Sequence, residues 1–307
     1  MRRLLADIAF RWDHWKAKRS GGAQPALRIY MFHSLFAHEQ ARDAGLAFPH
    51  EGITVSQFEA FIKISKEQGC HFITPGELLH AEPRQENCIL ITFDDGYANN
   101  LSALPILEKY EVPALFCVAT DFIAEGKAFW WDVIWRKEGA GKAARALLES
   151  RKSFSPAANE QFIMERYGNE ALQPVGEVDR PLSIEELKTF ASNPLVHIAN
   201  HSHTHPLFTQ LSQQQIEDEI TASQKLLSSW IGEKPDMFAY PNGSHQDETG
   251  AALQAIGLQH AFTTERCCYM SGENLPFHLG RIPLYGARDI AAQLAIHQNV
   301  DAGWYRR

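Results

Sequence analysis

The amino-acid sequence predicts an α/β fold in which seven or eight parallel strands form a barrel. After a polar break at residues 20–22, short apolar runs alternate with amphipathic stretches along the 307-residue chain. This alternation is typical of βα units, whereas separate α and β regions would group their elements. Since no internal repeat interrupts the pattern, we interpret residues 25–307 as one domain.

Eight apolar runs of strand length are the predicted strands. They lie at residues 27–32, 71–74, 88–93, 114–119, 195–199, 237–240, 260–263 and 281–284, of which 71–74 is the weakest. Helix starts are better marked, because Thr54, Ser183 and Ser212 each stand three residues before Gln or Glu. This spacing is the capping box, in which the two side chains satisfy each other's backbone N–H groups.

Two segments depart from the alternation. Residues 1–24 read as an amphipathic helix and linker, and the basic residues within 2–19 surround an apolar face. That face suits either contact with an anionic membrane surface or docking on the same domain or a partner subunit. Residues about 124–190 are rich in helix formers and read as a helical insertion between two strands.

Composition excludes several classes of protein. With 29 Lys and Arg against 37 Asp and Glu, the net charge is −8, so we expect no nucleic-acid partner. No apolar run reaches the roughly 18–20 residues of a spanning helix, and the first apolar run ends at Asp7, too early for a signal peptide. The five cysteines show no C-x-x-C spacing. We therefore expect a cytoplasmic protein, associated with the inner membrane face if residues 2–19 bind lipid.

The run at 88–93 leads directly into Asp94, Asp95 and Gly96. Two carboxylates then emerge at the carboxyl end of a strand, where barrels build their active sites. One carboxylate can bind a metal ion while the other acts as a base. A simple Asp-Asp-Gly turn is the structural alternative.

The run at 195–199 is followed by three histidines, His201, His203 and His205. His201 and His205 share one side of an extended or a helical segment. With Asp95 they would supply two imidazoles and one carboxylate, a set that suits Zn²⁺, with Co²⁺, Ni²⁺ or Fe²⁺ as alternatives. His203 is expected either to be exposed or to support a ligand.

Residues 92–96 (Thr-Phe-Asp-Asp-Gly) and 201–205 (His-Ser-His-Thr-His) resemble the first two motifs of the polysaccharide deacetylases, carbohydrate esterase family four of the NodB type. The resemblance extends from about residue 27 to the C-terminus. It implies a deformed (β/α) barrel, Asp94 as general base, and Asp95, His201 and His205 as metal ligands. It also implies hydrolysis of an N-acetyl or O-acetyl group.

Residues 238–243 resemble the third motif, which forms a wall of the substrate groove and lends a backbone N–H to the oxyanion. Tyr240 and Pro241 would then contact substrate, and Asn242 would supply the amide. Ala239 stands where many relatives carry an arginine that steadies the catalytic Asp. We expect Arg281 to replace it, a surface salt bridge being the alternative.

The run that ends in His33 resembles the first strand of the circularly permuted branch of the family, which includes poly-N-acetylglucosamine deacetylases. His33 would be the general acid that protonates the departing amine, unless it only ends a strand. His297 matches a later family motif by residue type, but it lies in a predicted helix at 287–297, so we prefer His33 as the general acid.

An aromatic run at the start of the insertion offers further substrate contacts. Trp130, Trp131 and Trp135 could provide a flat face for a pyranose ring or pack in the core, and Trp131 is our choice. Asp132 could bind hydroxyls or cap the helix, and Tyr97, two residues after Asp95, is a further expected substrate contact.

Together these residues predict a metal-dependent deacetylase acting on an N-acetylated sugar in a polysaccharide, an oligosaccharide or a lipid-linked glycan precursor. Two alternatives stay open. One is a carbohydrate-binding protein that keeps the fold without activity, and the other is a ferrous oxygenase that uses the two-His-one-carboxylate set.

Overall fold

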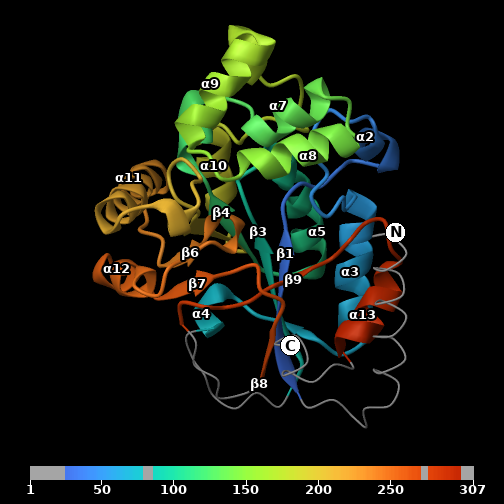
Figure 1. Ribbon diagram of the computed structural model, residues 1–307. Coiled ribbons are helices and arrows are strands. Elements are labelled where there is room, and N and C mark those ends of the chain that lie inside the picture. Colours follow the sequence, from blue (N-terminus) through green and yellow to red (C-terminus); the bar gives the residue numbers. More distant parts are fainter. Residues whose placement is uncertain (1–24, 79–85, 271–275, 299–307) are drawn as a thin grey trace.

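A computed structural model describes residues 25–78, 86–270 and 276–298. The helix predicted within residues 1–24 lies outside the described residues. Figure 1 shows a curled sheet covered by helices. Within the described ranges no helix combines the length and the apolar character needed to cross a bilayer.

The strands form one sheet in the order β7-β6-β5-β4-β3-β1-β8, with β2 paired to β3 and β9 to β1. They are β1 (Ala26–Phe32), β2 (His71–Phe72), β3 (Cys88–Phe93), β4 (Ala114–Val118), β5 (Val196–Asn200), β6 (Met237–Ala239), β7 (His260–Phe262), β8 (Cys268–Met270) and β9 (Ile282–Pro283). All eight predicted strands are present. The all-parallel prediction was wrong in one respect, because β8, which was not predicted, runs antiparallel to β1.

The sheet curls until its two ends nearly meet. Leu279 bridges Phe262 of β7 in parallel, and three residues later β9 begins beside Tyr30 and Met31 of β1. The segment 279–283 therefore joins β7, at one end of the strand order, to β1, and it carries Arg281. The predicted deformed (β/α) barrel is confirmed.

The helices are α2 (Glu39–Asp43), α3 (Val55–Glu67), α4 (Pro75–Leu78), α5 (Leu104–Tyr110), α6 (Thr120–Glu125), α7 (Trp130–Lys137), α8 (Lys142–Arg151), α9 (Pro156–Tyr167), α10 (Ile184–Ala191), α11 (Gln213–Ile231), α12 (Thr249–Ala255) and α13 (Ile290–Gln298). The three capping boxes of α3, α10 and α11 are confirmed, with both hydrogen bonds of each present. Between β4 and β5, helices α7, α8 and α9 gather over the end of the sheet where β1, β3 and β4 finish (Figure 1).

Alternation along the strands divides the core into two layers. Phe32 of β1 and Phe93 of β3 pack outward with Phe58 and Phe61 of α3. The residues between them, such as Ile29 and Leu90, fill the inside of the barrel. Each fully buried aromatic ring contributes about 1.5–3 kcal/mol, so this outer layer fixes which side of each strand faces inward.

Candidate active site

The inward-facing positions of two neighbouring strands lead to His33 and Asp94. On β1 the inward series includes Leu27 and Ile29, and on β3 it includes Cys88 and Leu90. The two strands pair in parallel with Phe32 opposite Phe93. One step further, His33 and Asp94 leave adjacent strand ends on the same side, so the register brings two residues 61 positions apart together.

Asp94 is held by Arg281. The guanidinium donates one hydrogen bond of 2.7 Å to each carboxylate oxygen of Asp94, and it also donates to Thr92 Oγ1 and to the carbonyl of Thr263. Both side chains are buried. Burial by itself would raise the pKa of Asp94, but the charge of Arg281 outweighs it and lowers that pKa to about 2. Asp94 is therefore an oriented, ionised carboxylate.

Asp95, His201 and His205 meet at one point. Each imidazole Nε2 lies 3.4 Å from Asp95 Oδ1, and this oxygen is buried with no hydrogen-bond partner among the described residues. Zinc at about 2.0–2.2 Å from each ligand in a tetrahedral site places the ligand atoms about 3.4 Å apart. The observed spacing and the orphaned oxygen therefore fit a divalent cation.

The loops that carry these ligands are strained and tightly supported. Asp95, Ser202 and His205 have positive φ, which L-residues adopt at a cost. The carbonyl of Ala239, on β6 beside β5, accepts a hydrogen bond from His201 Nδ1. Glu219 of α11 accepts hydrogen bonds from two backbone N–H groups of the histidine loop, those at positions 203 and 204. The fold therefore fixes the ligands before any cation binds.

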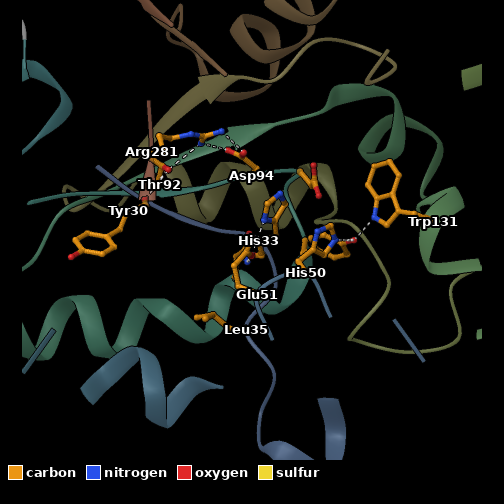
Figure 2. A network of polar contacts seen from close by, with 12 residues as sticks. Tyr30, His33, Leu35, His50, Glu51, Thr92, Asp94, Trp131 and Arg281 are labelled. Atoms are coloured by element: carbon orange, nitrogen blue, oxygen red, sulfur yellow. Dashed lines mark hydrogen bonds and ion pairs between the residues drawn. The ribbon is translucent and has the colours of Figure 1, made fainter. Parts of the chain in front are cut away.

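On the other side of Asp94, His33 pairs with Glu51. His33 Nδ1 lies 2.9 Å from Glu51 Oε2, and the carbonyl of His33 accepts a hydrogen bond from Asn100. Burial would lower the pKa of His33, but the charge and hydrogen bond of Glu51 outweigh it and raise that pKa to about 9. His33 is thus a protonated imidazolium at neutral pH. Figure 2 shows its ring between Asp94, Glu51 and His50.

A buried polar network lies beside this pair. The Tyr97 hydroxyl accepts from Trp131 Nε1 at 2.7 Å, donates to Asp132 Oδ2 at 2.9 Å, and lies 3.3 Å from His50 Nε2. Asp132 also accepts from the backbone N–H of Phe48. The Trp131 ring packs against His205, with centroids 4.9 Å apart.

This network corrects three predicted substrate contacts. Tyr97 and Asp132 are fully buried, and Trp131 is 7% exposed. The two carboxylate oxygens of Asp132 are both engaged inside the protein, so Asp132 is available neither to a sugar hydroxyl nor as a helix cap. The aromatic run is core, because Trp130 and Trp135 are also buried.

The third-motif residues form the turn after β6. Tyr240 and Pro241 are buried, and within the part of the chain that the structure describes the Tyr240 hydroxyl has no hydrogen-bond partner. Asn242 follows with a φ of 53° in the short 3₁₀ turn Pro241–Gly243. Substrate contact through Tyr240 and Pro241, and the role of the Asn242 amide, stay predictions.

Two histidines point elsewhere. The ring of His203 contacts Thr120 Oγ1 at 2.9 Å and lies 4.0 Å from Asp121, away from the ligand set. His297, in α13, lies 3.2 Å from the Tyr30 hydroxyl. Burial lowers the pKa of His297 to about 3, so its imidazole is neutral.

Sequence reasoning missed His50 and Glu51. They stand in the segment between α2 and α3 and follow no strand, so neither periodicity nor a motif marks them. The adjacent Pro49 and Gly52 indicated only a turn. A search for acidic residues that reach a strand-end histidine needs the three-dimensional structure.

Comparison with known proteins gives the family. The polysaccharide deacetylase family profile matches residues 81–261. The protein named "Putative polysaccharide deacetylase YxkH" from Bacillus subtilis (strain 168) is 25% identical over 244 residues, which cover 78% of this chain and 64% of that protein. This chain thus spans less than two thirds of that relative's length.

Solved structures share the fold. The Streptococcus pyogenes deacetylase PplD, in complex with acetate, superposes with a TM-score of 0.62 at 18% identity, covering 89% of this chain and 98% of that one. IcaB from Ammonifex degensii gives a TM-score of 0.63 at 18% identity, covering 91% and 100%. With a family profile that matches more than half of its residues, this chain belongs to the polysaccharide deacetylase family.

Proposed function

We propose that this protein is a metal-dependent deacetylase that hydrolyses the N-acetyl group of a sugar in a polysaccharide, an oligosaccharide or a lipid-linked glycan precursor. One observation carries the proposal. An ionised carboxylate, Asp94, and a protonated imidazole, His33, leave adjacent strands beside a ligand set that fits a cation. Amide hydrolysis needs a base, an acid and an electrophile in this arrangement.

Asp95, His201 and His205 are the residues that would hold the cation. Two imidazoles and one carboxylate leave coordination positions open, as in hydrolytic rather than structural zinc sites. Zn²⁺ suits these ligands best, and Co²⁺, Ni²⁺ and Fe²⁺ accept the same set. When bound, the cation polarises the acetyl carbonyl and lowers the pKa of water.

The side chains of the site then move two protons. Asp94, oriented by Arg281, accepts a proton from the attacking water. His33, charged through Glu51, donates a proton to the sugar nitrogen as the carbon–nitrogen bond breaks. The Asn242 backbone N–H is our proposed donor to the developing oxyanion.

The two alternative functions are less well supported. The missing arginine at position 239 favoured a non-catalytic binding protein, but in this chain the Arg281 guanidinium pairs with Asp94. A ferrous oxygenase usually has a double-stranded β architecture, whereas this chain is a βα barrel. The cytoplasmic location stays an expectation from the sequence.

The proposal is tested by acetate release from N-acetylglucosamine oligosaccharides by the full chain. We expect release to stop after chelation and to return with Zn²⁺ or Co²⁺. Asp94→Asn should abolish release while the protein still binds one equivalent of metal, measured by elemental analysis after gel filtration. Metal binding and sugar binding without acetate release by the wild type would favour the non-catalytic alternative.

A further inference from the structure

His50 stands next to the acid without a part in the reaction as described. Its ring lies parallel to that of His33, with centroids 4.2 Å apart and an interplanar angle of 9°. Figure 2 shows the two rings face to face, with His50 on the side that leads to Trp131. His50 has a φ of 44°, so its backbone adopts an unfavourable conformation to present the ring there.

Buried partners fix the far edge of His50. Its Nε2 lies 3.3 Å from the Tyr97 hydroxyl, which donates to the buried Asp132 and accepts from Trp131. Phe48 packs on His50 edge to face, at 4.9 Å between centroids. Tyr97, which the first turn of α7 holds in place, thus contacts the edge of the His50 imidazole, and His33 stacks on one face of the ring.

The stack is electrostatically favourable. Burial and then the charge of His33 lower the pKa of His50 well below its ordinary value, so the ring is neutral. A neutral aromatic face attracts a cation placed above it, and such a contact is stronger away from solvent. The pair is therefore an imidazolium on an imidazole, without repulsion between like charges.

We propose that His50 is a positioning residue for the general acid. Its stacked ring, held by Tyr97 and α7, keeps the His33 ring in the plane from which it donates to the leaving group. This inference rests on the proposed function, since it needs His33 to act as the acid. On this proposal α7 supports the general acid through Tyr97 and His50, in place of the sugar stacking predicted for Trp131.

A cation shared by His33, His50 and Asp95 is the alternative. One ligand atom from each lies within 4.8 Å of the others. Two imidazoles that bind one ion must turn their planes so that the lone pairs converge, and parallel rings do not. The geometry thus favours stacking, and the experiment distinguishes the two.

The experiment compares an amide with an activated ester in the metal-loaded full chain. An amine leaves only when protonated, whereas 4-nitrophenolate leaves without a proton, so misplacement of the acid lowers the ratio of amide to ester hydrolysis. His50→Leu removes the flat face, so we expect its ratio of amide to ester kcat to fall by about tenfold or more. This loss is part of the rate factor of about 10²–10⁴ that general acid catalysis supplies. His50→Phe keeps the face and should stay within about threefold of the wild type.

His203→Leu is the matched control, because its ring contacts Thr120 rather than His33, and its ratio should not change. Tyr97→Phe, which frees the far edge of His50, should lower the ratio less than His50→Leu does. The inference is overturned if His50→Leu keeps the wild-type ratio, or if both His50 variants lose one metal equivalent. If the wild type hydrolyses neither substrate, the proposed function fails instead.

Discussion

Arg281 and Asp94, 187 residues apart, form a fully buried bidentate pair with two N–O distances of 2.7 Å. Arg281 lies on the segment that joins β7 to β1, so the closure of the barrel itself delivers the guanidinium. This pair lets a chain with alanine at position 239 keep an oriented carboxylate at the end of β3.

Replacement of Arg281 should lower both the stability and the activity of the protein. Arg281→Met leaves the Asp94 charge buried without a partner, which should cost about 3–5 kcal/mol in unfolding free energy, and kcat should fall by about 10² or more. Urea denaturation and acetate release measure the two effects. Arg28→Met is the control. Like Arg281, Arg28 is a buried arginine, but it lies in β1 and donates hydrogen bonds to backbone carbonyls of α13. It should lose stability and keep kcat.

The pH dependence of kcat should show a broad plateau. The base form of Asp94 exists above its pKa of about 2, and the acid form of His33 exists below its pKa of about 9, so activity should decline only as pH rises toward about 9. Glu51→Gln removes the charge that raises the pKa of His33, so the alkaline limb should move to lower pH. If the alkaline limb of the Glu51→Gln profile lies at the wild-type pH, a group other than His33 causes the limb.

The His33–Glu51 pair should also make the unfolding free energy depend on pH. Because the folded pKa of His33 is raised above 6.5, the pair stabilises the protein at pH values below the unfolded pKa, and this contribution is lost as pH rises through about 9. The difference in unfolding free energy between the wild type and Glu51→Gln should therefore be larger at pH 6 than at pH 10. Equal differences at both values would contradict it.

Gly96 is required by the turn that presents Asp95. Its φ is +87°, and a Cβ there would lie 3.2 Å from Val118 Cγ1. Gly96→Ala should cost more than the about 1–2 kcal/mol of a left-handed L-residue and should weaken metal binding. Gly126→Ala gives the cost of a positive φ alone, since Gly126 has a φ of +61° and a Cβ there would meet no described residue within 4 Å apart from its chain neighbours. Equal stability of the two variants would show that the Val118 contact costs nothing.

The sequence predicted the features that are local or periodic. Strand positions followed from apolar runs, and the helix starts at Thr54, Ser183 and Ser212 followed from hydroxyl spacing. Once parallel neighbours are assumed, the convergence of Asp95 with His201 also follows, because carboxyl ends of parallel strands meet at one edge. Arg281 was found because the departure at Ala239 left a carboxylate that needed a cation.

What could not be predicted depends on long-range packing. The antiparallel β8 is three residues long and has no apolar alternation to mark it. Trp131 and Asp132 were read as substrate contacts because burial of a polar residue cannot be seen until its partners Tyr97 and Phe48 are placed. Glu51 and His50 reach the site from a turn, where sequence patterns carry little information about direction.

Anomalous diffraction across the zinc absorption edge, from crystals of the Zn²⁺-loaded full chain, tests the central claim most directly. The predicted result is a peak bounded by Asp95 Oδ1, His201 Nε2 and His205 Nε2, in which each imidazole nitrogen lies 3.4 Å from the carboxylate oxygen. No peak between these atoms, in protein that releases acetate, would contradict the account.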